Sequence, residues 1–266
     1  MNEHEQGQVA ASAAEIYDTF FVPALFAEWP AHVLRAAHVH AGDMVLDVAC
    51  GTGVLARAAA EVVVVDGAVT GVDINEGMLA LAQQKAPQIR WRHGAAEALS
   101  FADEKFDCVV SQFGLMFFQD PVAALVEMRR VLRPNGRLAI AVWDRLARTP
   151  GYAAVAQILS DLFGPGAAQS IEAPYAMGDT QQLSALFVEA GMPNATIETV
   201  VGQARFDSVE AWIYTDIKGW TLADVIDDAG YERLRTYAAP RLAQFVQPNG
   251  SVAFAAPAHI VTVVNR

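Results

Sequence analysis

The sequence predicts an α/β fold in which helices cover both faces of a largely parallel sheet. Between residues 41 and 145, short apolar segments of strand length alternate with segments of helical periodicity. The first of these strands runs into the turn Gly51-Thr52-Gly53, after which a helix is expected. Such alternation is typical of βαβ units, in which ligands bind at the carboxyl ends of the strands.

Each element of the first 145 residues follows from local pattern. Residues 9–40 contain two helical segments, 12–21 and 23–38, with Pro30 suited to a helix start. In the alternating core, strands are expected near 44–48, 69–73, 89–93, 106–112 and 136–143, and helices near 53–61, 75–85 and 121–132.

The pattern changes after Trp143. A helix from about 149 to 163 is expected to stop at Gly164-Pro165-Gly166, and a second one over 180–190 at Gly191. The remaining segments are a strand near 195–203, helices near 207–217, 220–227 and 229–245, and a strand near 258–264. Three regions are therefore expected: an N-terminal helical cap over 1–40, a ligand-binding core over 41–145, and a C-terminal region over 146–266.

Composition limits the possible partners. The chain has 266 residues and a formal charge of −12, which disfavours binding to nucleic acid. Its hydrophobic residues, 53% of the total, are interrupted by charges too often for a membrane span. Both cysteines, Cys50 and Cys108, fall in expected core elements, so no disulfide framework is indicated. Residues 1–8 are polar and unlike a signal peptide, which predicts a cytoplasmic protein.

The glycine turn and the next strand end indicate a nucleotide cofactor. The turn brings main-chain N–H groups of Gly51 and Gly53 close to a ligand, and Asp73 can accept hydrogen bonds from two ribose hydroxyls. The pattern Gly51-x-Gly53-x-x-Ala56 also satisfies the dinucleotide fingerprint of nicotinamide enzymes. Asp47 argues against that cofactor, because a carboxylate there would repel a diphosphate but tolerate a cationic ligand.

Five motifs follow one another over residues 45–143. The first is an acid, three residues and Gly-x-Gly, from Asp47 to Gly53, and the others lie at 72–78, 94–101, 106–112 and 131–138. Together they resemble the class I S-adenosylmethionine-dependent methyltransferases. The nearest likeness is to the ubiquinone/menaquinone-biosynthesis C-methyltransferase group (methyltransferase type 11), through Asp73-Ile74-Asn75-Glu76, Ala96-Glu97-Ala98 and Phe106-Asp107-Cys108. The C-terminal third departs from that group, so its substrate is not carried over.

The resemblance implies a cofactor, a topology and a set of binding residues. The cofactor is S-adenosylmethionine, with S-adenosylhomocysteine as product. The last two strands would complete a seven-stranded Rossmann-like sheet whose final strand is antiparallel, with the helices of about 206–246 inserted between them. The cofactor-binding residues would be Asp47, Gly51, Gly53, Asp73, Ile74, Met78, Ala96, Glu97 and Gln112.

Substrate information comes mainly by exclusion. Ser111-Gln112-Phe113-Gly114 lacks the Asn/Asp-Pro-Pro-aromatic motif of amide and adenine N6 methyltransferases, and neither cysteine follows a proline as in pyrimidine-carbon enzymes. Phe113, Phe117 and Trp143 are the candidates for an apolar substrate pocket. We therefore expect a small apolar or aromatic acceptor, methylated at oxygen, nitrogen or carbon.

Methyl transfer is an in-line displacement, and a base is needed only for a hydroxyl or carbon acid. His259 and Tyr17 are the candidates for such a base or for a substrate contact, and no metal-ligand spacing is present. Substrate choice is expected from the N-terminal helices and the insertion, whose aromatic residues are Trp212, Tyr214, Trp220, Tyr231, Tyr237 and Phe245. A non-catalytic adenosylmethionine-binding protein and a nicotinamide oxidoreductase remain open alternatives, and the residues do not determine the oligomeric state.

Overall fold

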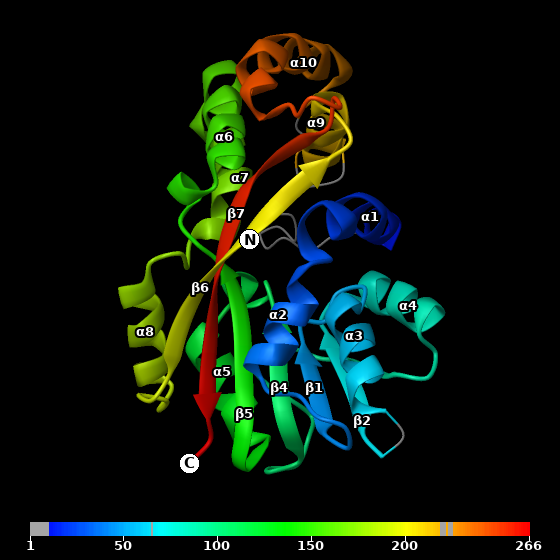
Figure 1. The fold of residues 1–266 in the computed structure, drawn as a ribbon, viewed down its shortest axis with the longest axis vertical. Coiled ribbons are helices and arrows are strands. Elements are labelled where there is room, and N and C mark those ends of the chain that lie inside the picture. Colours follow the sequence, from blue (N-terminus) through cyan, green and yellow to red (C-terminus); the bar gives the residue numbers. More distant parts are fainter. Residues whose placement is uncertain (1–10, 65, 219–221, 223–225) are drawn as a thin grey trace.

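The computed structural model describes residues 11–64, 66–218, 222 and 226–266, and contains a seven-stranded sheet (Figure 1). Its order is β3-β2-β1-β4-β5-β7-β6. The strands are β1 (Met44–Val48), β2 (Ala68–Asp73), β3 (Arg90–His93), β4 (Phe106–Gln112), β5 (Leu132–Trp143), β6 (Thr196–Phe206) and β7 (Val252–Val264). β7 runs antiparallel to both its neighbours, whereas the other pairings are parallel, which confirms the predicted Rossmann-like sheet.

Helices cover both faces of the sheet, as expected for buried parallel strands. Adjacent residues of β1 show the two sides: Val45 packs in one apolar cluster and Leu46 in the other. The first cluster includes residues of α2 (Trp29–Ala36) and α3 (Val54–Val63), and the second includes residues of α5 (Pro121–Arg130) and α8 (Thr180–Glu189). α4 (Glu76–Lys85) packs beside β2 and β3.

Helix starts at the ligand-binding end of the sheet are fixed by side-chain caps. Asn75 accepts a hydrogen bond from the N–H of Met78 and begins α4, and Asp120 accepts one from Ala123 and begins α5. Because α4 directly follows β2, this capping also fixes the backbone beside Asp73 at the strand end.

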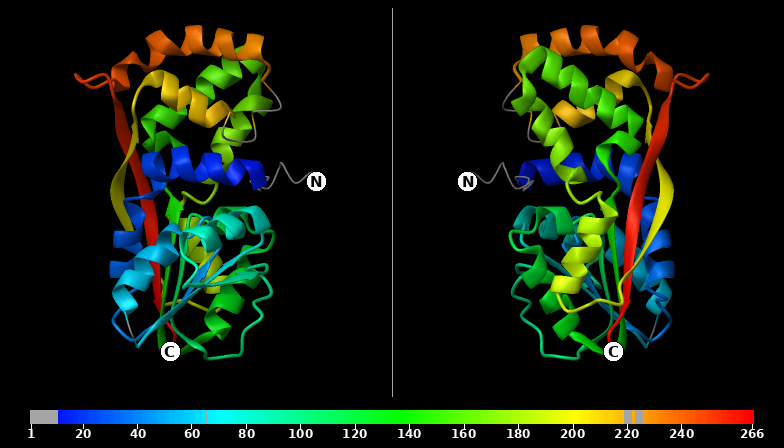
Figure 2. Two further views of the ribbon diagram at one scale, coloured as in Figure 1. Left: turned by 90° about the vertical axis from the view of Figure 1, so that its right-hand side faces the viewer. Right: turned by 90° about the vertical axis from the view of Figure 1, so that its left-hand side faces the viewer.

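A second group of helices lies beyond the carboxyl ends of the central strands. β6 and β7 pair from Thr196↔Thr262 to Phe206↔Val252, and only the second half of β7 also pairs with β5. This two-stranded ribbon leads out of the sheet to α6 (Pro150–Phe163), α7 (Pro165–Glu172), α9 (Val209–Lys218) and α10 (Asp228–Leu242) (Figure 1). α1 (Ala11–Ile16) lies between these helices and the sheet domain (Figure 2).

Several boundaries differ from the sequence expectation. The segment Gly164-Pro165-Gly166 ends α6, as expected, but it also begins α7 at Pro165. A proline is tolerated in the first turn of a helix, where its missing N–H is not needed. The chain does not break before Pro23 but continues as a π-helix, η2 (Tyr17–Phe26). β7 begins at Val252 rather than 258, because its first half pairs only with β6. Most of the helix expected over 220–227 lies outside the described residues. Among those described, no helix is long and apolar enough to cross a bilayer.

Candidate functional site

The turn after β1 has a strained backbone and open space above it. Ala49, Gly51 and Gly53 all have positive φ, at 57°, 53° and 82°. A Cβ on Gly51 would meet no atom within 4 Å, so the space there is free for a ligand. A Cβ on Gly53 would lie 2.4 Å from the Trp91 ring, so this glycine is required by packing as well as by its backbone conformation.

Asp73 is bound into the same turn. Its Oδ2 accepts a 2.8 Å hydrogen bond from the Gly51 N–H, and its Oδ1 accepts one of 2.8 Å from the Asn75 N–H. Burial raises the pKa of this carboxyl, and the N–H groups of Asn75 and Gly51 oppose that shift. Since each carboxylate oxygen can accept two hydrogen bonds, Asp73 retains the capacity to accept hydrogen bonds from a ligand.

Asp47 is a buried acid with no strong partner. It lies within β1, between Gly71 of β2 and Val110 of β4, and is 1% exposed. Neither carboxylate oxygen forms a well-aligned hydrogen bond, although the backbone N–H of Ala56 lies close enough to favour the charged form. Burial nevertheless raises the pKa of this carboxyl well above its usual range, and the neighbouring Asp73 raises it further. A cationic ligand nearby would stabilise the ionised form.

A groove of about 510 Å³ extends from Asp73 along the carboxyl ends of the strands. Glu97 borders it and accepts N–H hydrogen bonds from Gln119 (2.9 Å) and Asp120 (3.4 Å). Four residues predicted to bind the cofactor line this groove: Asp73, Ile74, Ala96 and Glu97. Met78 is buried in α4 and does not line it, and Gln112 donates a 3.2 Å hydrogen bond from Nε2 to the Phe26 carbonyl.

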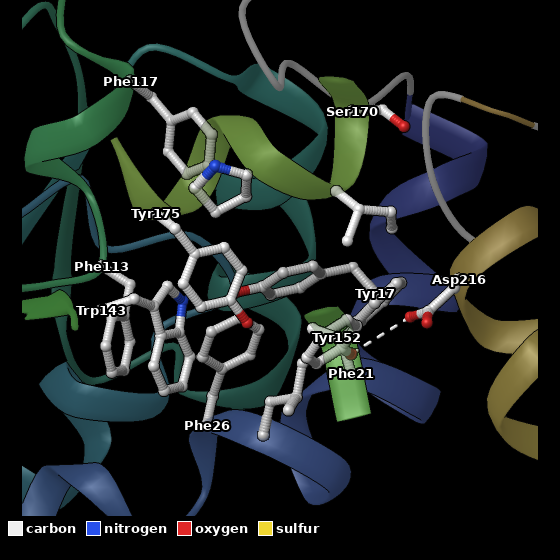
Figure 3. Close-up of a pocket in the computed structure, with 13 residues that line it drawn as sticks. Tyr17, Phe21, Phe26, Phe113, Phe117, Trp143, Tyr152, Ser170, Tyr175 and Asp216 are labelled. Carbon is white, nitrogen blue, oxygen red and sulfur yellow. Dashed lines mark hydrogen bonds between the residues drawn. The ribbon is translucent and has the colours of Figure 1, made fainter. Parts of the chain in front are cut away.

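A second cavity, the aromatic pocket, adjoins the groove and has a volume of about 90 Å³ (Figure 3). Phe113, Phe117 and Trp143, the three predicted substrate residues, all line it. The Phe113 and Trp143 rings stack with centroids 3.9 Å apart. Phe117 lines both the pocket and the groove. The other lining residues are Tyr17, Phe21, Leu25, Phe26, Tyr152, Ser170, Ile171, Pro174, Tyr175 and Asp216.

Sequence reasoning missed Tyr152, Tyr175 and Asp216. They lie on α6, η5 (Ala173–Tyr175) and α9, which share no recognisable motif. Asp216 did carry a signal, because it follows Trp212 by one helical turn and precedes Ile217 on an apolar face. An acid on the buried face of a helix is unusual enough to mark a functional candidate.

The structure places the two candidate bases differently. Tyr17 lines the aromatic pocket, and burial together with the negative charges of Asp73 and Asp18 raises the pKa of its phenol. His259 lies within β7 and does not line the pocket. Its Nδ1 is 2.8 Å from Thr199 Oγ1, and its Nε2 is 3.1 Å from the Gly178 carbonyl and 3.2 Å from Asp144.

The aromatic residues of the insertion lie mostly behind or outside the pocket. Trp212 is fully buried and packs against Tyr152 and Phe254. Tyr214 is 44% exposed. The remaining described members, Tyr231, Tyr237 and Phe245, also do not line the pocket, and Trp220 lies outside the described residues.

Comparison with known proteins agrees with this geometry. Residues 46–140 match the model of the methyltransferase domain family. The demethylmenaquinone methyltransferase of Staphylococcus epidermidis is 34% identical over 188 residues, which cover 65% of this chain and 78% of that protein. That of Lysinibacillus sphaericus is 32% identical over 190 residues, or 66% and 81% of the two chains.

Solved structures share the fold at low sequence identity. The YcgJ protein of Bacillus subtilis superposes with a TM-score of 0.59 at 18% identity, covering 90% of this chain and 98% of that one. A SAM-dependent methyltransferase from Aquifex aeolicus gives a TM-score of 0.55 at 18% identity, covering 95% and 99%. The chain therefore belongs to the class I S-adenosylmethionine-dependent methyltransferases, near the menaquinone group, and is an enzyme that uses S-adenosylmethionine as methyl donor.

Proposed function

We propose that this methyltransferase acts on a small aromatic metabolite held in the aromatic pocket while S-adenosylmethionine occupies the groove. The observation that carries the proposal is Phe117, whose side chain lines both cavities. Methyl donor and acceptor must meet in line over a short distance, and two cavities that share a lining residue would place the two ligands next to each other.

The groove has a donor and acceptor set that fits the cofactor. We assign the binding of the ribose hydroxyls to Asp73, which retains free acceptor capacity. We expect the ligand to approach the backbone most closely at Gly51, where the space is open. Gly53 supports the turn through its contact with Trp91. Ile74, Ala96 and Glu97 border the adenine end, with Met78 packed beneath and Gln112 at the methionine end.

S-adenosylmethionine supplies a methyl group on a positively charged sulfonium and also carries an ammonium group. The buried carboxylate of Asp47 fits a cationic ligand, because the protein gives it no strong partner of its own. A diphosphate would meet repulsion from Asp47, whereas Asp73 suits the ribose of either cofactor. The residues present therefore fit adenosylmethionine better than a nicotinamide dinucleotide.

The acceptor pocket is suited to an aromatic ring. Eight of its lining residues are aromatic, and none of the described lining residues is Lys, Arg or His. A pocket of this composition binds a flat apolar ring by burial and ring stacking, and it provides no cation to hold an anionic substrate. The curated relatives are named for methyl transfer to demethylmenaquinone.

The chain's own residues hold and shield the acceptor. We assign to Tyr17 a contact with the acceptor in its neutral form, because burial and nearby acids raise its pKa. We assign to His259 a structural role, since both its ring nitrogens are engaged by protein groups. The N-terminal segment up to residue 40 and the helical insertion of about 206–246 would then act as a cap that excludes water from the core 41–145, while the rest of 146–266 completes the sheet.

The proposal is tested by incubating the purified protein with S-adenosylmethionine and single acceptors, and measuring S-adenosylhomocysteine by mass spectrometry. The aromatic panel is 2-naphthol, catechol and 1,4-dihydroxynaphthalene, and the polar panel is glycine, glycerol and ethanolamine. The account predicts product above the no-acceptor background only with aromatic acceptors, and loss of this turnover in Phe117→Ala. Turnover confined to the polar panel would contradict it.

A further inference from the structure

Asp216 places a buried carboxyl in the wall of the aromatic pocket. It lies on α9 and is 2% exposed. Its side chain points toward Tyr152, and both lie on the opposite side of the pocket from Phe113 and Trp143 (Figure 3). Phe117, the residue that the pocket shares with the groove, also lies well apart from Asp216 in this view (Figure 3).

Only half of this carboxyl is satisfied by the protein. Oδ1 accepts a 3.1 Å hydrogen bond from the Tyr152 hydroxyl, whereas Oδ2 is buried and has no hydrogen-bond partner among the residues that the structure describes. The indole N–H of Trp212 lies near the carboxyl but does not reach hydrogen-bond geometry. Leaving a buried polar atom unsatisfied costs about 1–3 kcal/mol, so its persistence in a ligand pocket indicates a partner supplied by the ligand.

The surroundings favour the neutral acid over the carboxylate. In the described part of the chain, the titratable side chains that face Asp216 are Tyr152 from α6 and Tyr175 from η5, and neither carries positive charge. Burial raises the pKa of Asp216 to about 8, which the Tyr152 hydroxyl and the Trp212 indole only partly oppose. At neutral pH the group therefore carries a proton, and Oδ2 can donate it in a hydrogen bond.

We propose that Asp216 is a substrate-binding residue, whose protonated carboxyl donates a hydrogen bond from Oδ2 to an uncharged oxygen acceptor on the aromatic substrate. This inference rests on the proposed function and deepens it, because it defines the substrate as an aromatic ring bearing a carbonyl, ether or hydroxyl oxygen. The ring would stack among the aromatic side chains and the oxygen would point toward α9. Asp216 would then fix the orientation of the acceptor atom at the opposite end.

The test uses three probes of nearly equal shape: acetophenone, ethylbenzene and 1-phenylethylamine. They present a carbonyl oxygen, no polar group and a cationic amine at the same position. Dissociation constants are measured by NMR titration of the full chain saturated with S-adenosylhomocysteine, at pH 6.5. We expect acetophenone to bind about three- to tenfold tighter than ethylbenzene, the contribution of one hydrogen bond.

Two variants separate donor from charge. Asp216→Asn keeps a neutral donor and should keep most of the preference for acetophenone, whereas Asp216→Leu should abolish it. Asp161→Asn is the matched control, because that acid bonds only with Gln157 and Tyr237 outside the pocket. A preference that survives in Asp216→Leu would overturn the proposal. The proposal would also be overturned if 1-phenylethylamine bound most tightly of the three probes and Asp216→Asn abolished this binding. That result would show that Asp216 is an ionised carboxylate that binds cations.

A pH series on the wild-type chain gives a second, mutation-free test. The preference for acetophenone should fall as pH rises from 6.5 to 9.5, because the ionised carboxyl has lost the proton that it donates. A preference that is constant over this range would contradict the proposal. Because these assays measure binding alone, a negative result would overturn the role of Asp216 and would leave the proposed methyl transfer standing. Absence of turnover with saturating aromatic acceptors would instead count against the proposed function itself.

Discussion

The N–H of Gly51 donates a 2.8 Å hydrogen bond to Oδ2 of Asp73, which joins the turn after β1 to the carboxyl end of β2. The two strands are neighbours in the sheet, with Val48 paired to Val72. The carboxylate thus fixes the turn and borders the groove at once. A substitution at either residue should therefore weaken cofactor binding more than it lowers the stability of the fold.

Replacing Asp73 with Ala should weaken S-adenosylmethionine binding by about tenfold to a hundredfold. The variant loses hydrogen bonds to a charged acceptor, each worth about 1.5–3 kcal/mol. Isothermal titration calorimetry measures the dissociation constant directly. Asp103→Ala is the control, because that acid is exposed and pairs with Arg130 away from the groove. An unchanged dissociation constant in Asp73→Ala would remove the ribose assignment.

Replacing Gly51 with Val should abolish cofactor binding. The side chain would fill the open space above the turn, which we assign to the ligand, and the positive φ of this residue would strain any side chain. Gly42→Val imposes similar strain, at a φ of +86° and in equally open space, but precedes β1 at the other end of the strand. Thermal shift with S-adenosylmethionine should therefore show ligand stabilisation for Gly42→Val and none for Gly51→Val.

Cys50→Ala should be nearly silent in the same assay. The thiol is buried, and burial together with Asp47 and Asp73 raises its pKa well above the usual range, so it stays protonated and is a poor nucleophile. If this variant lost catalysis while it still bound the cofactor, a covalent role for Cys50 would have to be considered.

Replacing Asp47 with Asn should change how stability depends on pH. The folded pKa of Asp47 lies above its unfolded value, so between the two the folded state holds a proton that the unfolded chain has released. The free wild-type protein should lose stability as pH rises from about 4 toward the folded pKa, by about 1.4 kcal/mol per unit of pH.

Asp47→Asn removes that loss, so the ligand-free variant should be more stable than wild type at pH 7–8 and should bind S-adenosylmethionine more weakly. Urea unfolding at pH 5, 6, 7 and 8 measures the slope, with exposed Asp103→Asn as control. If the unfolding free energies of wild type and Asp47→Asn varied with pH in parallel, the ionised form of Asp47 would already be stabilised in the ligand-free protein.

Replacing His259 with Ala should destabilise the fold by about 1–3 kcal/mol, because the Gly178 carbonyl and Thr199 hydroxyl lose a buried partner. Cofactor affinity should remain within about twofold of wild type. His40→Ala, at an exposed position, should change neither. A large loss of kcat in His259→Ala at full stability would instead restore this residue as the catalytic base.

The sequence was sufficient for the parts of the molecule that repeat a local pattern. Short strands that are mostly apolar, such as Met44–Val48 with its single acid Asp47, and the glycine turn predicted the parallel core and the groove around Asp73. Long-range pairing was not readable in this way. The first half of β7 pairs only with β6, from which α9 and α10 separate it in the sequence. No local pattern in residues 252–257 predicts a strand.

The aromatic pocket shows the same division. Phe113 and Phe117 follow β4 and Trp143 is the last residue of β5, so their position near the site could be predicted. Tyr152, Tyr175 and Asp216 reach the pocket from separate helices whose packing is set by tertiary contacts alone. The insertion was expected to contribute aromatic rings, whereas the lining residue it contributes among those described is the acid Asp216.

The most direct test of the account is a crystal structure with S-adenosylhomocysteine bound. The account predicts that the ribose hydroxyls donate to Asp73 and that the sulfur lies against Phe117, facing the aromatic pocket, within the contact distance of about 4 Å. A complex in which the ribose avoids Asp73, or in which the sulfur points away from Phe117, would contradict it.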